Sequence, residues 1–215
     1  MKSNVLASFA AGVCGLITCG GLQAHDFIGN TELNAGYSEV IDMNVNHGCK
    51  GSPVKAVRVK IPEGVTGVAL YNTRDWKVET KLRKLDKPIP GEGGRLITET
   101  VDEIMWKDPA SPMPASGVFE TFKFRASLPD SPGKVLFFPT ITVCEQGDDK
   151  YVDLPKQELR AEMLDFGKKL GEFMYATPGP SPFVVLKKPT RPQRPWIVPA
   201  QAGEPAAAKS AAKKE

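Results

Sequence analysis

Histidine is scarce in this chain, which has only two among its 215 residues, His25 and His47. If both bind a metal ion, none is left to build a Ser-His-Asp or Cys-His catalytic centre. Aromatic residues make up only 8% of the chain, and no aromatic-rich platform for a polysaccharide is evident. These shortages favour a protein that binds a ligand over an enzyme.

The first 24 residues have the pattern of a secretory signal peptide. Met1-Lys2 supplies a short positive start, 5–22 is apolar and uncharged, and Leu22-Gln23-Ala24 resembles a cleavage site. A transmembrane anchor is the alternative, but several glycines interrupt the apolar run. We therefore predict a signal peptide at 1–24, and cleavage would make His25 the first residue of an exported chain.

Cysteine is also sparse, with four residues in all. Cleavage removes Cys14 and Cys19 and leaves Cys49 and Cys144. An even pair in an exported chain favours one disulfide. A pair of thiolate metal ligands is the alternative, although no CxxC motif accompanies either residue.

The net positive charge of the chain is concentrated near its C-terminus. From Lys187 onward there are seven basic and two acidic residues, whereas the rest has a small negative balance. The folded part therefore does not have the character of a nucleic-acid-binding protein.

Short strands dominate the pattern from about 37 to 155. Apolar and polar residues alternate over 57–61, 76–82 and 122–125, and 135–143 is a nearly continuous apolar run that favours a central strand. Turn signals separate these segments. Seven or eight such strands predict an all-β, immunoglobulin-like antiparallel sandwich over 25–155.

The remainder of the chain follows two other patterns. Apolar residues recur at helical spacing, which predicts a helical extension over 156–176. The segment 177–215 is rich in proline and ends in alanine and lysine, so we expect it to be largely disordered.

An N-terminal histidine is an unusual metal ligand. Its α-amine loses a proton more readily than a lysine does, and amine and imidazole Nδ1 can chelate one ion. A third nitrogen from His47 would complete a set that suits Cu(II) better than tetrahedral zinc. Glu32 and Glu39 are candidates for an additional oxygen ligand, and the spacing selects neither. The alternatives are that His25 is a surface residue and that His47 is a turn residue packed on the disulfide.

The chain resembles the YcnI-like copper-binding family of secreted bacterial proteins over 25 to about 155. The matching blocks are HGCKGSP (47–53), VRVKIPEGV (57–65), DWKVET (75–80), TETV (98–101) leading to Trp106, FETFKF (119–124), LPD (128–130), FFPT (137–140) and CEQG (144–147). The start differs, because the family commonly begins His-Val-Thr and this chain begins His25-Asp26-Phe27.

The resemblance implies a periplasmic immunoglobulin-like domain that binds Cu(II) through its mature N-terminal histidine. It implies that His47 replaces a carboxylate ligand of other members and that Trp106 lies near the copper, although core filling is an equal alternative for Trp106. The expected function is a copper chaperone or homeostasis protein, not an enzyme. Its partners would be copper and another copper chaperone or membrane copper transporter, without nucleic acid. A histidine-brace monooxygenase and a metal-free interaction module are the alternatives.

Overall fold

The computed structural model describes residues 25–91 and 94–190, which form a predominantly antiparallel β-sandwich with one short helix. The predicted signal peptide at 1–24 and the tail from residue 191 lie outside the described residues. The elements are β1 (Phe27–Ile28), β2 (Glu32–Asn34), β3 (Ser38–Val45), β4 (Val54–Lys60), β5 (Thr66–Leu70), β6 (Lys77–Pro90), β7 (Leu96–Lys107), β8 (Glu120–Ser127), β9 (Val135–Phe137), β10 (Thr140–Cys144), β11 (Asp148–Tyr151), α1 (Phe166–Ala176) and β12 (Phe183–Lys187).

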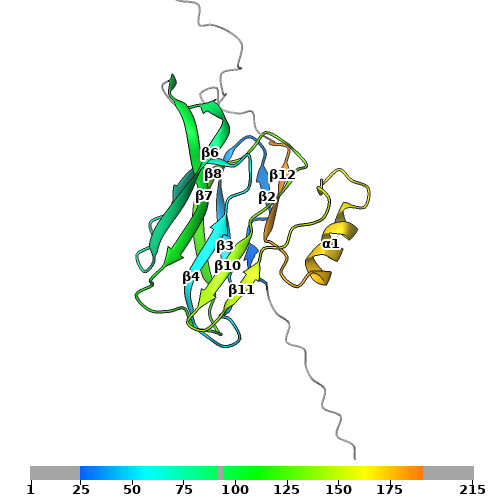
Figure 1. Ribbon diagram of the computed structural model, residues 1–215. Helices are drawn as coiled ribbons and strands as arrows, with labels where there is room; N and C mark the ends of the chain where they lie inside the picture. Colours follow the sequence, from blue (N-terminus) through cyan, green and yellow to red (C-terminus); the bar gives the residue numbers. More distant parts are fainter. Residues whose placement is uncertain (1–24, 92–93, 191–215) are drawn as a thin grey trace, which may run out of the picture.

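Three sheets build the molecule (Figure 1). One has the strand order β1-β3-β8-β5, the second has the order β11-β10-β4-β7-β6, and the third has the order β2-β12-β9. The two larger sheets face each other through aromatic side chains. Trp106 of β7 packs on Phe122 of β8 with ring centroids 5.1 Å apart. The predicted all-β sandwich is therefore confirmed.

Two of the predicted alternating patterns are confirmed as half-buried strands. In β4, Val57 and Val59 are fully buried, whereas Arg58 and Lys60 lie on the outer face. In β8, Phe122 and its even-numbered neighbours are buried while the lysine and arginine between them are exposed. Successive strand residues point to opposite faces, so each pattern places one face in the core.

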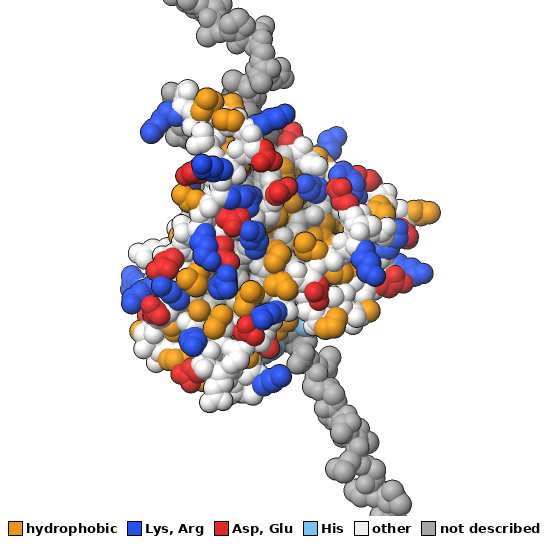
Figure 2. All heavy atoms as spheres, in the orientation of Figure 1, with side chains coloured by type: hydrophobic (Ala, Val, Ile, Leu, Met, Phe, Trp, Pro, Cys, Tyr) orange, Lys and Arg blue, Asp and Glu red, His pale blue; other side chains and the backbone are white. Residues whose placement is uncertain are grey.

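The outer face of the large sheet carries charges of both signs. Arg58 binds Glu103 at 2.8 Å and Lys60 binds Asp102 at 2.7 Å across neighbouring strands. Figure 2 shows acidic and basic side chains interspersed over one face of the molecule. Neither sign forms a continuous patch on that face.

The third alternating segment, 76–82, begins inside the sandwich and then extends beyond it. Trp76 and Val78 pack into the core, but Leu82 is 60% exposed. Strands β6 and β7 continue beyond the other strands as a projecting hairpin (Figure 1). Within the described residues no sheet covers that extension, so the same alternation no longer leads to burial.

The apolar run 135–143 is two strands and not one. β9 belongs to the three-stranded sheet, and β10 belongs to the five-stranded sheet. Pro139 lies between them and has no N–H to continue a ladder, although its carbonyl accepts a hydrogen bond from the backbone of Lys60 at 2.9 Å. The chain changes sheets at this residue.

The helix is shorter than the predicted 156–176. It begins at Phe166, and Phe173 packs edge-on against Phe137 with ring centroids 5.4 Å apart. Upstream, the backbone N–H of Ala161 donates to the carbonyl of Gly133 at 2.8 Å. This contact with the sandwich replaces the helical hydrogen bonds that the spacing predicted. Within the described residues, no helix is long and apolar enough to span a membrane.

The prediction of a disordered segment from residue 177 is wrong for residues 183–187. These residues form β12, which runs parallel to β2 and antiparallel to β9. Val184 and Leu186 are completely buried in the core. The apolar stretch between the flanking prolines therefore has enough side-chain surface to complete a sheet.

Candidate metal centre

The pairing of β1 with β3 brings the segments of the two histidines together. The strands are antiparallel with Phe27 opposite Asn44, and two further residues along this register His25 lies opposite Asn46. The Nδ2 of Asn46 donates to the backbone oxygen of His25 at 3.1 Å. His47 follows directly, so both histidines of the chain lie at the same end of the sandwich.

The ring of His47 is oriented by its own loop. Nδ1 lies 2.9 Å from the backbone oxygen of Gly48. A carbonyl only accepts hydrogen bonds, so this contact requires the proton on Nδ1. In that tautomer the lone pair is on Nε2, which is the arrangement found when a histidine binds a metal and donates its other N–H to a carbonyl.

The loop that carries His47 is fixed by the predicted disulfide. Cys49 and Cys144 are joined, with their Cα atoms 5.9 Å apart and 95 residues between them in sequence. The backbone N–H of Cys49 also donates to the sulfur of Cys144 at 2.8 Å. The bond connects the end of β10 to the residue two after His47, and such bonds are typical of exported proteins.

A buried carboxyl group lies directly after His25. Asp26 is 1% exposed, and its Oδ2 accepts a hydrogen bond from Thr142 Oγ1 at 2.6 Å. Its Oδ1 is also buried and has no hydrogen-bond partner in the described part of the chain. Burial raises the pKa of Asp26 to about 7, although the Thr142 hydrogen bond and nearby His47 act to lower it. A buried carboxylate is costly unless it is paired, so this environment favours a cation.

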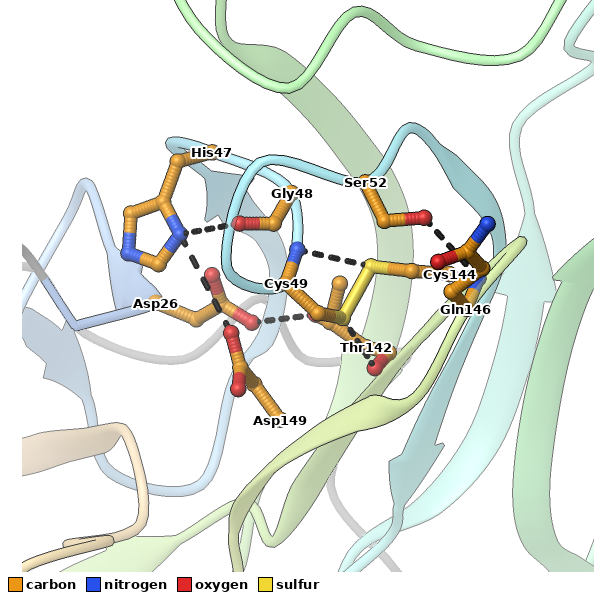
Figure 3. The surroundings of a disulfide bond; sticks show 9 residues. All are labelled: Asp26, His47, Gly48, Cys49, Ser52, Thr142, Cys144, Gln146 and Asp149. Atoms are coloured by element: carbon orange, nitrogen blue, oxygen red, sulfur yellow. Dashed lines mark hydrogen bonds and ion pairs between the residues drawn. A yellow bond between two sulfur atoms is a disulfide. The ribbon is translucent and has the colours of Figure 1, made fainter.

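Strand β11 supplies two more side chains to the same region. Asp149 lies opposite Thr142 in the sheet, and its Oδ2 is 4.0 Å from Nδ1 of His47. Tyr151, on the same side of the strand, packs its ring 5.6 Å from the ring of His25. Burial, and then the charges of Asp26 and Asp149, raise the pKa of the tyrosine hydroxyl. Figure 3 shows Asp26, His47 and Asp149 directed toward one another beside the disulfide.

The side chains alone do not make a complete metal site. In the described ranges, no group of three or more His, Cys, Asp or Glu side chains is arranged to hold a metal ion. A centre built on His25 and His47 therefore needs a further donor. The α-amine of His25 would be that donor, and it exists only after cleavage of the preceding peptide bond.

Sequence reasoning pointed to other supporting residues. Trp106 is fully buried and packs on Phe122 and Phe124, so its position is that of a core residue. Neither of the carboxylates predicted as oxygen ligands lies beside His47. Glu39 accepts a hydrogen bond from Asn34 at 2.6 Å, and Glu32 lies 3.9 Å from Lys187. The carboxylates that the fold brings to His47 are Asp26 and Asp149.

Asp26, Asp149 and Tyr151 could not be identified from the sequence for a clear reason. Asp26 precedes a strand of only two residues, too short for an alternating pattern to show that it faces inward. Asp149 and Tyr151 belong to a charged segment after Gly147 that has the composition of a solvated turn. The adjacency of Asp26 to His25 was the one available signal.

Solved structures give a likeness in fold. An uncharacterized protein from Nocardia farcinica with an immunoglobulin-like fold aligns at 17% identity and a TM-score of 0.51, covering 76% of this chain and 99% of that one. The predicted immunoglobulin-like sandwich is thereby confirmed. The seventh ScaB type I cohesin of Pseudobacteroides cellulosolvens aligns at 12% identity and a TM-score of 0.33, covering 79% and 95%, which is too remote for any inference.

Sequence comparison relates the chain to a protein family. No curated protein matches the chain significantly. A family model described as "Domain of unknown function (DUF1775)" matches residues 25–164, so the match begins at His25. This is the family that includes the YcnI-like proteins, and the predicted resemblance is confirmed at that level. The chain belongs to the DUF1775 family.

Proposed function

We propose that this protein binds Cu(II) in the periplasm and acts in copper transfer or homeostasis, with His25 as the N-terminal residue and principal ligand. The observation that carries the proposal is the proximity of the two histidine segments, fixed by the Asn46 hydrogen bond to His25. They are the only histidines of the chain. A disulfide within the domain agrees with export from the cytoplasm.

The donor set suits copper in its oxidised state. The α-amine and imidazole of His25 offer two nitrogens, and Nε2 of His47 offers a third. Nitrogen donors of this kind favour Cu(II), which has the highest affinity in the divalent series. The buried carboxyl of Asp26, with one oxygen lacking a hydrogen-bond partner in the described residues, supplies negative charge nearby. The proposal requires no catalytic acid or base, because it ascribes binding and transfer of copper to the protein.

The test compares two forms of the protein that differ only at the N-terminus. One begins at His25, as verified by mass spectrometry, and the other carries four extra residues, Gly-Ser-Gly-Ser, before His25. A single added residue would not serve, because its own free amine could chelate copper together with the His25 ring. Converting the amine into an amide removes one arm of the chelate, so we expect Cu(II) affinity to fall by at least about 100-fold, or about 2.7 kcal/mol. Titration against a copper chelator measures the affinity, and equal affinities of the two forms would overturn the proposal.

A further inference from the structure

Asp149 has no assigned role in the donor set described above, yet it faces one of the proposed ligands. Its Oδ2 is 4.0 Å from Nδ1 of His47, on the side of the ring that also faces the carbonyl of Gly48. Both side chains are about three-quarters buried. At 4.0 Å the two atoms are not hydrogen-bonded, and Oδ2 would accept a hydrogen bond from the Nδ1–H group only if the ring moved closer.

The position of Asp149 is fixed by the sheet. It pairs with Thr142, and Thr142 in turn binds the carboxyl of Asp26 at 2.6 Å. The disulfide ends two residues further along β10, at Cys144. Asp149, Asp26 and the His47 loop are therefore attached to the same short piece of β10 (Figure 3).

The second carboxyl indicates that a cation belongs here. Asp26 is buried, its Oδ1 has no hydrogen-bond partner in the described ranges, and it is close enough to Asp149 for their charges to interact. Two carboxylates in a poorly solvated place repel each other unless one is protonated or positive charge is added. A divalent ion at His47 would balance both.

We propose that Asp149 is a positioning residue of the copper site, which together with the Gly48 carbonyl keeps the proton on Nδ1 of His47 and thereby directs Nε2 to the metal. This inference rests on the proposed copper-binding function. Metal-bound histidines commonly donate their other N–H to a carboxylate or a carbonyl, which fixes the tautomer and makes the ligand more basic. His47 has a carbonyl and a carboxylate on that side.

The experiment measures Cu(II) affinity in the protein that begins at His25. Asp149→Asn keeps the shape of the side chain and removes its charge, and we expect the affinity to fall by about 10- to 100-fold. Asp148→Asn is the matched control, because Asp148 is the neighbour on the opposite side of β11 and pairs with Lys150 at 3.3 Å. We expect less than about a twofold change for this control.

A double-mutant cycle separates positioning from a general effect of charge. If Asp149 acts through His47, Asp149→Asn has no further effect on affinity in a His47→Ala background. An equal loss in both backgrounds would overturn the inference, as would an unchanged affinity for Asp149→Asn. Asp149→Glu, which keeps the carboxylate, should recover affinity, and no recovery would count against the inference.

The outcomes also distinguish this inference from the function on which it rests. If the unsubstituted protein binds Cu(II) and Asp149→Asn binds it equally well, only the role of Asp149 fails. If the unsubstituted protein does not bind Cu(II), the proposed function fails as well. Thermal unfolding of the copper-free variants identifies any loss of affinity that results from misfolding.

Discussion

Asp26 combines complete burial with a carboxyl oxygen that has no hydrogen-bond partner in the described ranges. In the copper-free protein this group is more easily accommodated when it is protonated, because burial opposes the charged form. Its pKa of about 7 lies well above the ordinary value of 3.8. The free energy of unfolding should therefore contain a pH-dependent contribution from Asp26.

The pKa of Asp26 is raised in the folded state, so between about pH 4 and 7 the folded state keeps a proton on Asp26 that the unfolded state has released. The Asp26 contribution to the free energy of unfolding is therefore full below pH 4 and is lost as the pH rises through 7. We expect Asp26 to lower the free energy of unfolding by up to about 4 kcal/mol between pH 4 and pH 8.

Urea denaturation of the copper-free protein and of Asp26→Asn at pH 5 and pH 8 tests this expectation. The difference between the two proteins isolates Asp26 from other titrating groups. The Asn variant should gain stability relative to the parent as the pH rises. Parallel pH dependences for the two proteins would contradict the account.

At the residue scale, the sequence predicted part of the candidate site. The disulfide followed from the count of cysteines that remain after the predicted cleavage. The supporting carboxylates could not be found in the same way, because Asp26 and Asp149 come together only through the pairing of β10 with β11. Local spacing contains no information about such a contact.

At the scale of elements, local patterns were reliable where a strand is covered on one face. They failed where coverage depends on distant segments, as in the projecting β6–β7 hairpin and in β12. The prolines around residues 183–187 favour disorder, but Val184 and Leu186 fill a gap between β2 and β9. The gain from burying these side chains outweighs the local preference.

The role of β12 can be tested by a single substitution. Leu186 is completely buried, so we expect Leu186→Ala to lower the free energy of unfolding by about 2–5 kcal/mol. Lys187→Ala is the control, with an expected effect within about 0.5 kcal/mol, because Lys187 is half exposed and lies 3.9 Å from Glu32. Chemical denaturation measures both, and similar small effects would mean that β12 is not part of the folded core.

At the scale of the whole molecule, the sandwich fixes the relative position of two short segments distant in sequence. β1 is the edge strand of one sheet, and β11 is the edge strand of the other, beside β10. His25 precedes β1, His47 follows β3 and Asp149 lies in β11, and these segments lie at one end of the molecule. The sequence predicted the fold class, since alternation and turn signals recur along it, but not the sheet order that brings Asp149 to His47.

The central claim is that the α-amine of His25 is a copper ligand. Histidine labelled with ¹⁵N only at its α-nitrogen enters this chain at His25 and His47 alone, and the α-nitrogen of His47 is a peptide nitrogen. Pulsed electron paramagnetic resonance of the Cu(II)-loaded mature protein then reports directly on the amine. We expect a strong ¹⁵N coupling typical of a coordinated nitrogen. Imidazole ¹⁴N couplings without any ¹⁵N coupling from the α-position would contradict the account.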